Sequence, residues 1–212
     1  NVLVQRKKPG MAGGPGFIAL CRSMSEMTSH SVVLRCQLVG VNGTVGVNMV
    51  YIKEPIPIGV VFVALGFATA EEWLPFIRGI PASGRRFVDA VARDAAVAGS
   101  RENALAIIGS LGVHPIPQEG RAAYASQIVL SEMLPHIAIS SPPATRAAFL
   151  GRMMVKLVRC HLGVRIEDDR DNYGFKRVEA SGGLFRGLFW TVYKRFLKTI
   201  KQTISKKEGS DV

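Results

Sequence analysis

The spacing of apolar positions changes about a quarter of the way along the chain. In residues 32–39, Val32, Leu34, Cys36 and Leu38 recur at every second position, as expected for a strand with one mostly apolar face. An Asn42-Gly43 pair follows, and Asn-Gly is the strongest short signal for a β-hairpin. Further strands are predicted at residues 1–4, 17–21 and 45–52. The opening of the chain, about residues 1–52, therefore predicts a small antiparallel sheet.

Beyond the sheet the apolar spacing becomes helical. Thr69 with Glu72 three residues later forms a capping-box pattern, which marks the start of a helix. Phe149, Met153 and Leu157 recur at helical spacing in the most strongly helical segment. Helices are predicted at residues 60–65, from 69 onward, and at 87–98, 100–111, 119–134 and 145–162. The expected fold class is α+β, a small antiparallel β-sheet followed by a mainly α-helical body.

A last helix is predicted at residues 184–204, after a break at Ser181, Gly182 and Gly183. The apolar side chains expected to face inward are Phe185, Leu188, Phe189, Val192, Phe196 and Ile200. The cations that crowd its second half are Lys194, Arg195, Lys198, Lys201, Lys206 and Lys207. Cations near a helix C-terminus complement the helix dipole, and cations along an edge bind phosphates. The sequence leaves both roles open.

The charge balance points to a polyanionic partner. The 212 residues include 27 Lys and Arg against 16 Asp and Glu, a net charge of +11, which favours nucleic acid over a membrane. No apolar run reaches the ~18 residues of a membrane span. The basic residues 6–8 precede Pro9 and glycines rather than the apolar region of a signal peptide. The start at Asn1 and the polar tail lead us to expect a fragment of a longer protein.

Candidate catalytic and metal-binding residues form no motif. The cysteines Cys21, Cys36 and Cys160 include no CxxC pair, so neither a disulfide framework nor a structural zinc site is expected, and a reducing compartment fits. Combinations of Ser, His and Asp lack a local motif that would support them. His136, next to Pro135, is expected to be a packed or capping histidine rather than a base.

The most highly charged stretch, residues 168–177, follows a predicted helix, and we term it the elbow. Its acids are Asp168, Asp169 and Asp171, and its cations are Arg170, Lys176 and Arg177. Helices on both sides hold its ends, so it suits the outward presentation of side chains. On composition alone, a solvated loop is the commoner outcome. Two further alternatives are that the acids pair with the cations and tie the elbow down, or that they bind a divalent metal in an unrelated helical enzyme.

The elbow resembles the DDRDHxGxKR segment of the second-largest, β-type subunit of multisubunit DNA-directed RNA polymerases of eukaryotic or viral type. Residues 51–58 and 62–66 look like the YIK-x-x-IPI and FRALG segments of that subunit. The other similar stretches are residues 104–109, 133–137 and 146–153, which resemble its ALxxIG, FLPHI and KxxFLGxM segments. The resemblance runs along almost the whole chain. It implies the lobe region of the subunit, called domain 2.

The resemblance implies a division of the chain and a set of partners. Residues 1–165 would form the lobe, with its β-rich opening at about 1–52, and residues 166–212 would form the elbow and a basic helix that returns to the rest of the subunit. In that family the lobe walls the DNA channel. The implied partners are DNA, the largest subunit, other polymerase subunits and initiation factors, and no membrane. The implied localisation is the nucleus, or the cytoplasm or virion for a viral protein.

The resemblance also implies roles for single elbow residues. The expected nucleic-acid contacts are Asp171, Lys176 and Arg177, the first two matching residues near the non-template strand in bacterial relatives. The residues expected to shape the elbow are Asp168, Asp169 and Gly174, and one of the two acids is alternatively a partner that locks Arg177. No catalytic residue, metal or cofactor is expected here, because in the family the Mg²⁺ of the assembled polymerase is held by the largest subunit.

Four positions depart from the family pattern, and two other hypotheses stay open. The departures are Asn172 for His, Phe175 for Asn or Lys, Val63 for Arg and Gly183 for Pro. They indicate a divergent lineage, viral or protist. A free-standing basic DNA-binding domain predicts steeply salt-dependent binding by the isolated chain. A metal enzyme predicts that Mg²⁺ or Mn²⁺ raises the melting temperature.

Overall fold

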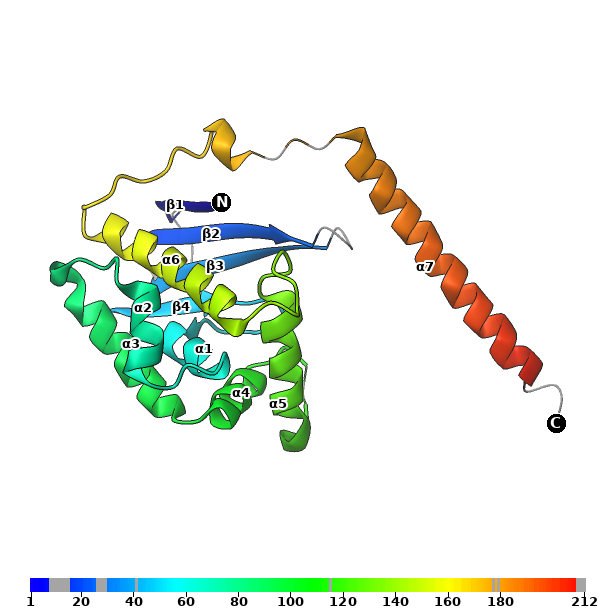
Figure 1. Cartoon of the computed structure of the whole chain (residues 1–212), viewed down its shortest axis with the longest axis horizontal. Coiled ribbons are helices and arrows are strands. Elements are labelled where there is room, and N and C mark those ends of the chain that lie inside the picture. The colour runs from blue at the N-terminus through cyan, green and yellow to red at the C-terminus, as the bar shows by residue number, and fades with distance from the viewer. Residues whose placement is uncertain are drawn as a thin grey trace.

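Five antiparallel strands form one sheet in the order β1-β2-β3-β4-β5. The computed structural model describes residues 1–7, 16–25, 30–40, 42–114, 116–176, 178 and 180–208, and of these it describes residues 207 and 208 by their backbone alone. The strands are β1 (Val2–Arg6), β2 (Phe17–Met24), β3 (Ser31–Val39), β4 (Thr44–Asn48) and β5 (Ile56–Pro57) (Figure 1). Helices follow the sheet along the chain, so the predicted α+β class is confirmed.

The sheet has one covered face and one open face. Alternation along β3 buries Leu34 and Cys36, while Val33 and Arg35 on the other face are exposed. On the covered face, α6 (Pro143–His161) packs on β1, β2 and β3, and α1 (Ile58–Ala64), buried along its whole length, packs on β4 and β5 (Figure 1). The open face is therefore free to form a surface with the segment that follows α6.

The returning strand of the predicted hairpin ends earlier than expected. β3 and β4 pair as predicted, but the strand predicted at residues 45–52 stops at Asn48. Tyr51 takes a left-handed backbone conformation with a φ of 65°, which a strand cannot continue. Its carbonyl accepts the Val113 N–H at 2.9 Å. The end of the predicted strand thus pairs with residues 111–113, far along the chain.

Two helices of the body begin at the residues where the sequence predicts helix starts. Thr69 N–H donates to Glu72 Oε2 at 3.0 Å, and Ser100 Oγ accepts the Asn103 N–H at 3.2 Å, so both predicted helix starts are confirmed. The helices are α2 (Ala70–Ile77), α3 (Arg85–Ala98), α4 (Arg101–Ser110) and α5 (Gln118–Gln127), with a 3-10 turn at Ala82–Gly84. The helix predicted at residues 119–134 changes into a π turn at Ile128–Glu132.

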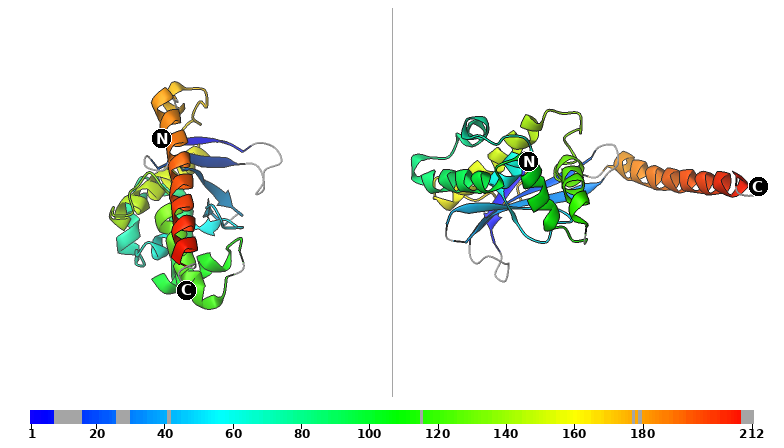
Figure 2. Two further views of the ribbon diagram at one scale, coloured as in Figure 1. Left: turned by 90° about the vertical axis from the view of Figure 1, so that its right-hand side faces the viewer. Right: turned by 90° about the horizontal axis from the view of Figure 1, so that it is seen from below.

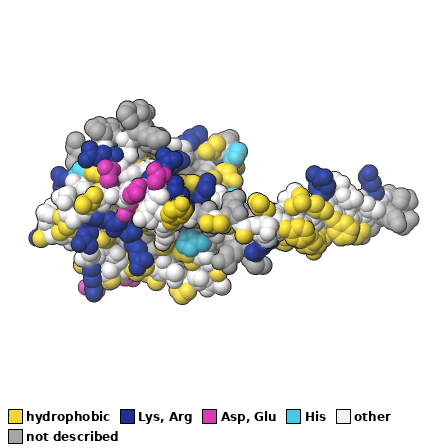
Figure 3. Space-filling model, turned by 90° about the horizontal axis from the view of Figure 1, so that it is seen from above, with side chains coloured by type: hydrophobic (Ala, Val, Ile, Leu, Met, Phe, Trp, Pro, Cys, Tyr) yellow, Lys and Arg dark blue, Asp and Glu magenta, His cyan; other side chains and the backbone are white. Residues whose placement is uncertain are grey.

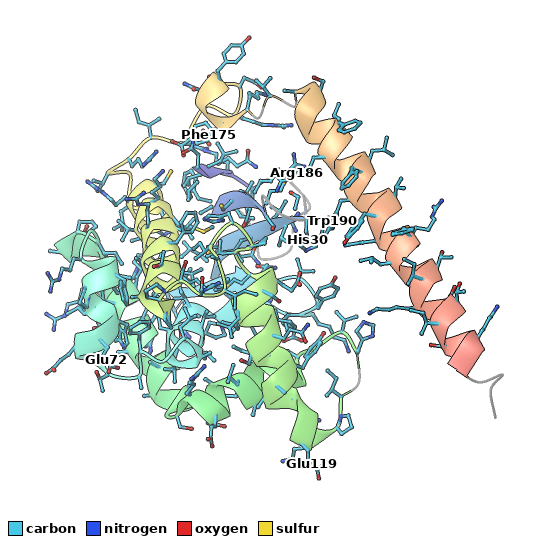
Figure 4. The ribbon with its side chains drawn as sticks, turned by 45° about the vertical axis from the view of Figure 1, so that its right-hand side comes forward. His30, Glu72, Glu119, Phe175, Arg186 and Trp190 are labelled. Atoms are coloured by element: carbon cyan, nitrogen blue, oxygen red, sulfur yellow. The ribbon has the colours of Figure 1, made fainter. Side chains whose placement is uncertain are left out.

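Helix α7 (Ser181–Glu208) extends away from the body (Figures 1 and 2). Two predictions about it are wrong. Ser181, Gly182 and Gly183 form its first turn rather than a break. The apolar side chains predicted to face inward are exposed: Phe185, Leu188, Phe189, Val192, Phe196 and Ile200. The helix turns its opposite face, with Trp190 and Lys194, toward the body (Figure 4), so its apolar side has nothing in the described chain to pack against.

The described part of the chain contains no helix that combines the length and apolar character needed to cross a bilayer.

Candidate nucleic-acid interface

The acidic end of the elbow is fastened to the free edge of the sheet. Asp168 N–H donates to the Val4 carbonyl, and Val4 N–H donates to Asp168 Oδ2, both at 2.9 Å. Just before the elbow, Glu167 Oε2 accepts the Arg6 N–H at 3.1 Å. β1 is an edge strand, so these bonds satisfy backbone groups that the sheet leaves unpaired. The elbow therefore continues the sheet at its β1 edge.

The side chain of Asp168 is largely buried. Its side chain is 10% exposed, and Oδ1 accepts a hydrogen bond from Arg165, three residues earlier. A carboxylate that accepts from a guanidinium and from a backbone N–H is held in one orientation. Asp168 thus has a structural role. Arg177, the partner that the sequence suggested, lies outside the described residues.

Two bonds from side chain to backbone shape the tip of the elbow. Asp169 Oδ1 accepts the Asp171 N–H at 2.9 Å, and Asn172 Oδ1 accepts the Gly174 N–H at 2.8 Å. Turns of this kind are typical of Asp and Asn. They lead into a 3-10 turn at Tyr173–Phe175. The tip therefore has a defined shape that does not depend on a hydrophobic core.

Two of the sequence-predicted nucleic-acid contacts form an ion pair on the exposed side of the elbow. Lys176 Nζ donates to Asp171 Oδ1 at 2.9 Å, and the two side chains are 45% and 84% exposed. The hydrogen bond from Lys176, and then its charge, hold the pKa of Asp171 below its usual range, so the carboxylate is charged at neutral pH. An exposed pair contributes little to the fold, which leaves both groups available to a ligand.

A hollow of about 470 Å³ lies between the elbow and the open face of the sheet. Leu3, Leu20 and Val33, from three adjacent strands, form apolar walls, together with Phe175 of the elbow (Figure 4). The cations that line it are Arg22, Arg170 and Lys176. Among the described residues that line the hollow, none is a carboxylate. Figure 3 shows this side of the molecule, with Lys and Arg side chains outnumbering the acids.

The chemistry of this hollow suits a nucleotide. Apolar walls that include an aromatic ring stack on a base, and three cations at the rim neutralise phosphate. Asp171, which is ion-paired with Lys176, can accept a hydrogen bond from a base amino group. The volume lies within the range of pockets that hold small ligands.

Sequence reasoning missed Arg22 as a member of this site. Arg22 lies on β2, where its neighbours Cys21 and Ser23 are buried on the other face. Period-two alternation along β2 was the signal that would have placed Arg22 on the open face. Its proximity to the elbow depends on the pairing of β1 with residues 167–168, which no local pattern reveals.

The three elbow acids do not converge on a common point. Asp168 binds Arg165 and Val4, Asp169 binds its own backbone turn, and Asp171 binds Lys176. No cluster of three or more His, Cys, Asp or Glu side chains that could hold a metal occurs in the described ranges. This arrangement gives the metal-enzyme hypothesis no support.

The remaining candidate groups make packing contacts rather than form a site. Cys21, Cys36 and Cys160 are buried free thiols, and burial raises the pKa of Cys36 to about 12. His136 Nδ1 lies 2.7 Å from Ser23 Oγ, its ring packs on Phe149, and burial lowers its pKa. The prediction of a packed histidine is confirmed.

Comparison with known proteins covers the body and the elbow. The family model described as RNA polymerase Rpb2, domain 2, matches residues 8–179. The chain is 32% identical over 191 residues to DNA-directed RNA polymerase II subunit 2 of Arabidopsis thaliana, covering 88% of this chain and 15% of that protein. It is 36% identical over 163 residues to subunit RPB2 of Meyerozyma guilliermondii, covering 75% and 13%. For subunit Rpo2N of Methanococcus vannielii the identity is 30% over 177 residues, covering 80% and 36%. The chain thus spans a small part of the length of these relatives.

Proposed function

The chain belongs to the family of RNA polymerase Rpb2, domain 2, and we propose on this basis that it walls the nucleic-acid channel of a DNA-directed RNA polymerase and offers a docking surface for initiation factors. In this role it assembles with the largest subunit and other subunits. It supplies no catalytic residue, cofactor or metal ligand, since Mg²⁺ for nucleotidyl transfer would be held by the largest subunit. We propose a nuclear location, with cytoplasm or virion as the alternative for a viral polymerase.

Within this role, we propose that the elbow and the hollow beside it hold an unpaired nucleotide of DNA. The observation that carries the proposal is the combination of apolar walls and three exposed cations in one hollow. Lys176 and Arg177 would contact phosphates, and Asp171 would accept from a base. Asp168, Asp169 and Gly174 would keep the elbow in shape.

Replacing Lys176 and Arg177 together by Ala in the assembled polymerase is expected to shorten the lifetime of its DNA complexes about tenfold, because two phosphate contacts are lost and each adds about one unit to the salt slope. The measurement is dissociation after a salt challenge at several ionic strengths. Arg78→Ala with Arg85→Ala is the matched control, since both arginines are exposed elsewhere on the body. Full salt resistance of the elbow variant would show that the elbow is no nucleic-acid contact.

The hollow can be tested separately from the elbow. Arg22→Ala is expected to weaken the same complexes about threefold, the effect of one partly screened charge. Arg35→Ala is the control, because Arg35 is exposed on the same open face but does not line the hollow. Equal effects of the two substitutions would attribute the binding to the overall charge of the sheet face.

The apolar side of α7 is expected to be covered by other parts of the polymerase. Apolar side chains of α7 are exposed along one side of the helix (Figure 3), and they include Phe185, Leu188, Phe189, Val192 and Phe196. Replacing Phe185 and Phe189 by Ser is expected to reduce both self-association of the isolated chain and co-purification with the largest subunit, because contiguous apolar surface drives association. Lys198→Ser with Lys201→Ser, on the opposite side, is the control. Light scattering and pull-down measure the two effects, and unchanged co-purification would place α7 outside the interface.

A further inference from the structure

A second basic hollow lies where α4 ends and α5 begins. Its volume is about 610 Å³, and its basic side chains are Lys53, His114 and Arg121. Ile116 and Pro117 add apolar surface to the same lining. In Figure 1 the elbow and the junction of α4 and α5 lie at opposite ends of the body. This hollow is therefore separate from the proposed nucleic-acid surface.

The backbone on the Lys53 side is held by hydrogen bonds between distant segments. Lys53 N–H donates to the Leu111 carbonyl, and Val113 N–H donates to the Tyr51 carbonyl, both at 2.9 Å. Tyr51, two residues before Lys53, is the only non-glycine residue with a positive φ among the residues that the structure describes. A conformation of this kind persists only where the surroundings fix it. The segment that carries Lys53 is therefore fixed before any ligand binds.

The other wall is held by a close contact between helices. Gly109 of α4 lies so near α5 that a Cβ there would overlap the Arg121 carbonyl. The Arg121 side chain is itself oriented, because its Nε donates to the Ile116 carbonyl at 3.3 Å. Both walls of the hollow are thus preformed, which lowers the entropy lost on binding.

The basic groups of this hollow lack acidic partners in the part of the chain that the structure describes. No carboxylate is among the described residues that line it, and within the described ranges none of the three basic side chains forms an ion pair. Like charges held close together repel one another, and a bound anion relieves that repulsion. The hollow is therefore a preformed anion site with adjoining apolar surface.

We propose that this hollow docks an acidic segment of a partner protein, with carboxylates against Lys53 and Arg121 and an apolar side chain against Ile116 and Pro117. The inference deepens the proposed factor-docking role and rests on it, but it does not depend on nucleic-acid binding by the elbow. A short basic surface with adjoining apolar residues favours a peptide over DNA, whose phosphate backbone needs an extended basic track. Charge complementarity supplies the specificity, as at other charged interfaces.

The test is fluorescence anisotropy with the whole 212-residue chain and a labelled peptide of repeated Asp-Asp-Leu units. The wild-type chain is expected to bind this peptide and not the same peptide with Asn in place of Asp. Lys53→Glu with Arg121→Glu is expected to weaken binding about tenfold, because two partly screened attractions become repulsions. Arg78→Glu with Arg85→Glu carries the same charge change elsewhere and is expected to change the affinity less than about twofold.

Each alternative outcome overturns the proposal. No binding by the wild-type chain, or equal losses in the two charge-reversal variants, would remove the hollow as a docking site. Tighter binding of a single-stranded oligonucleotide, abolished by the same substitutions, would make it a nucleic-acid site. Lys53→Glu alone is a second variant in which folding is not at risk, because Lys53 is exposed and its side chain forms no hydrogen bond or ion pair in the described chain. It is also expected to weaken peptide binding. Lys176→Ala with Arg177→Ala is expected to leave peptide binding unchanged, so failure of the elbow proposal would be seen separately.

Discussion

Replacing Arg146 by Ala is expected to destabilise the chain by about 4 kcal/mol, because a fully buried side chain and its hydrogen bonds are lost together. Arg146 has no exposed surface. Its Nη2 donates to the carbonyls of Leu130, Ile137 and Ala138 at 2.9, 3.0 and 3.0 Å. Without the guanidinium, three carbonyls that face the core lose their donor, and a cavity remains.

The position of these carbonyls explains why so large a group is buried. The Leu130 carbonyl belongs to the π turn that ends α5, and the other two belong to the turn that leads toward α6. Carbonyls at helix ends and in turns have no partner within their own element. Arg146, in the second turn of α6, reaches back to satisfy them and joins three segments of the chain. Burial lowers the pKa of Arg146, but an arginine stays protonated in proteins.

Urea and thermal unfolding, followed by circular dichroism, measure this effect. The melting temperature of Arg146→Ala is expected to fall by roughly 8–16 °C, since about 1 kcal/mol corresponds to about 2–4 °C in a domain of this size. Arg152→Ala, exposed on the same helix, is expected to stay within about 0.5 kcal/mol of wild type. Arg146→Lys keeps the charge and a nitrogen donor, but its side chain is shorter and cannot place that nitrogen where Nη2 lies, so it is expected to recover only part of the loss. A loss below about 1 kcal/mol for Arg146→Ala would contradict the bonding scheme.

Features of the fold that depend on neighbouring residues were predictable from the sequence. The hairpin and the helix starts at Thr69 and Ser100 follow from short motifs, and the structure confirms them. The early end of β4 was not predictable, because Tyr51 is held by Val113, more than sixty residues away. The orientation of α7 was not predictable either. A helical stripe of apolar residues indicates that one side of the helix packs against something, but it does not indicate whether the packing partner is part of the same stretch of chain.

The candidate site shows the same limit. The charged run 168–177 was visible in the sequence, and the family resemblance implied which of its residues shape the elbow and which contact nucleic acid. Its attachment to β1 was not visible, because Asp168 and Val4 are 164 residues apart. The hollow, and the membership of Arg22 in it, depend on that attachment. The candidate site therefore forms because the elbow pairs with a strand that is distant in the sequence.

Asp168→Ala is expected to destabilise the chain by about 2–3 kcal/mol and to release the elbow from the sheet, because it removes a largely buried acceptor and leaves Arg165 without its partner. The DNA complexes of the assembled polymerase are expected to lose about as much lifetime as with Lys176→Ala and Arg177→Ala, although Asp168 is not among the residues that line the hollow. Hydrogen exchange at the Val4 amide reports the release directly.

Asp169→Ala provides the control, since Asp169 is exposed and bonds only within its own turn. It is expected to change stability by less than about 0.5 kcal/mol and to leave the Val4 amide protected. The decisive comparison is between the elbow's attachment and its effect on DNA. If Asp168→Ala exposes the Val4 amide to exchange while the DNA complexes keep their lifetime, an ordered elbow is unnecessary for binding, and the contact must come from the open face of the sheet alone.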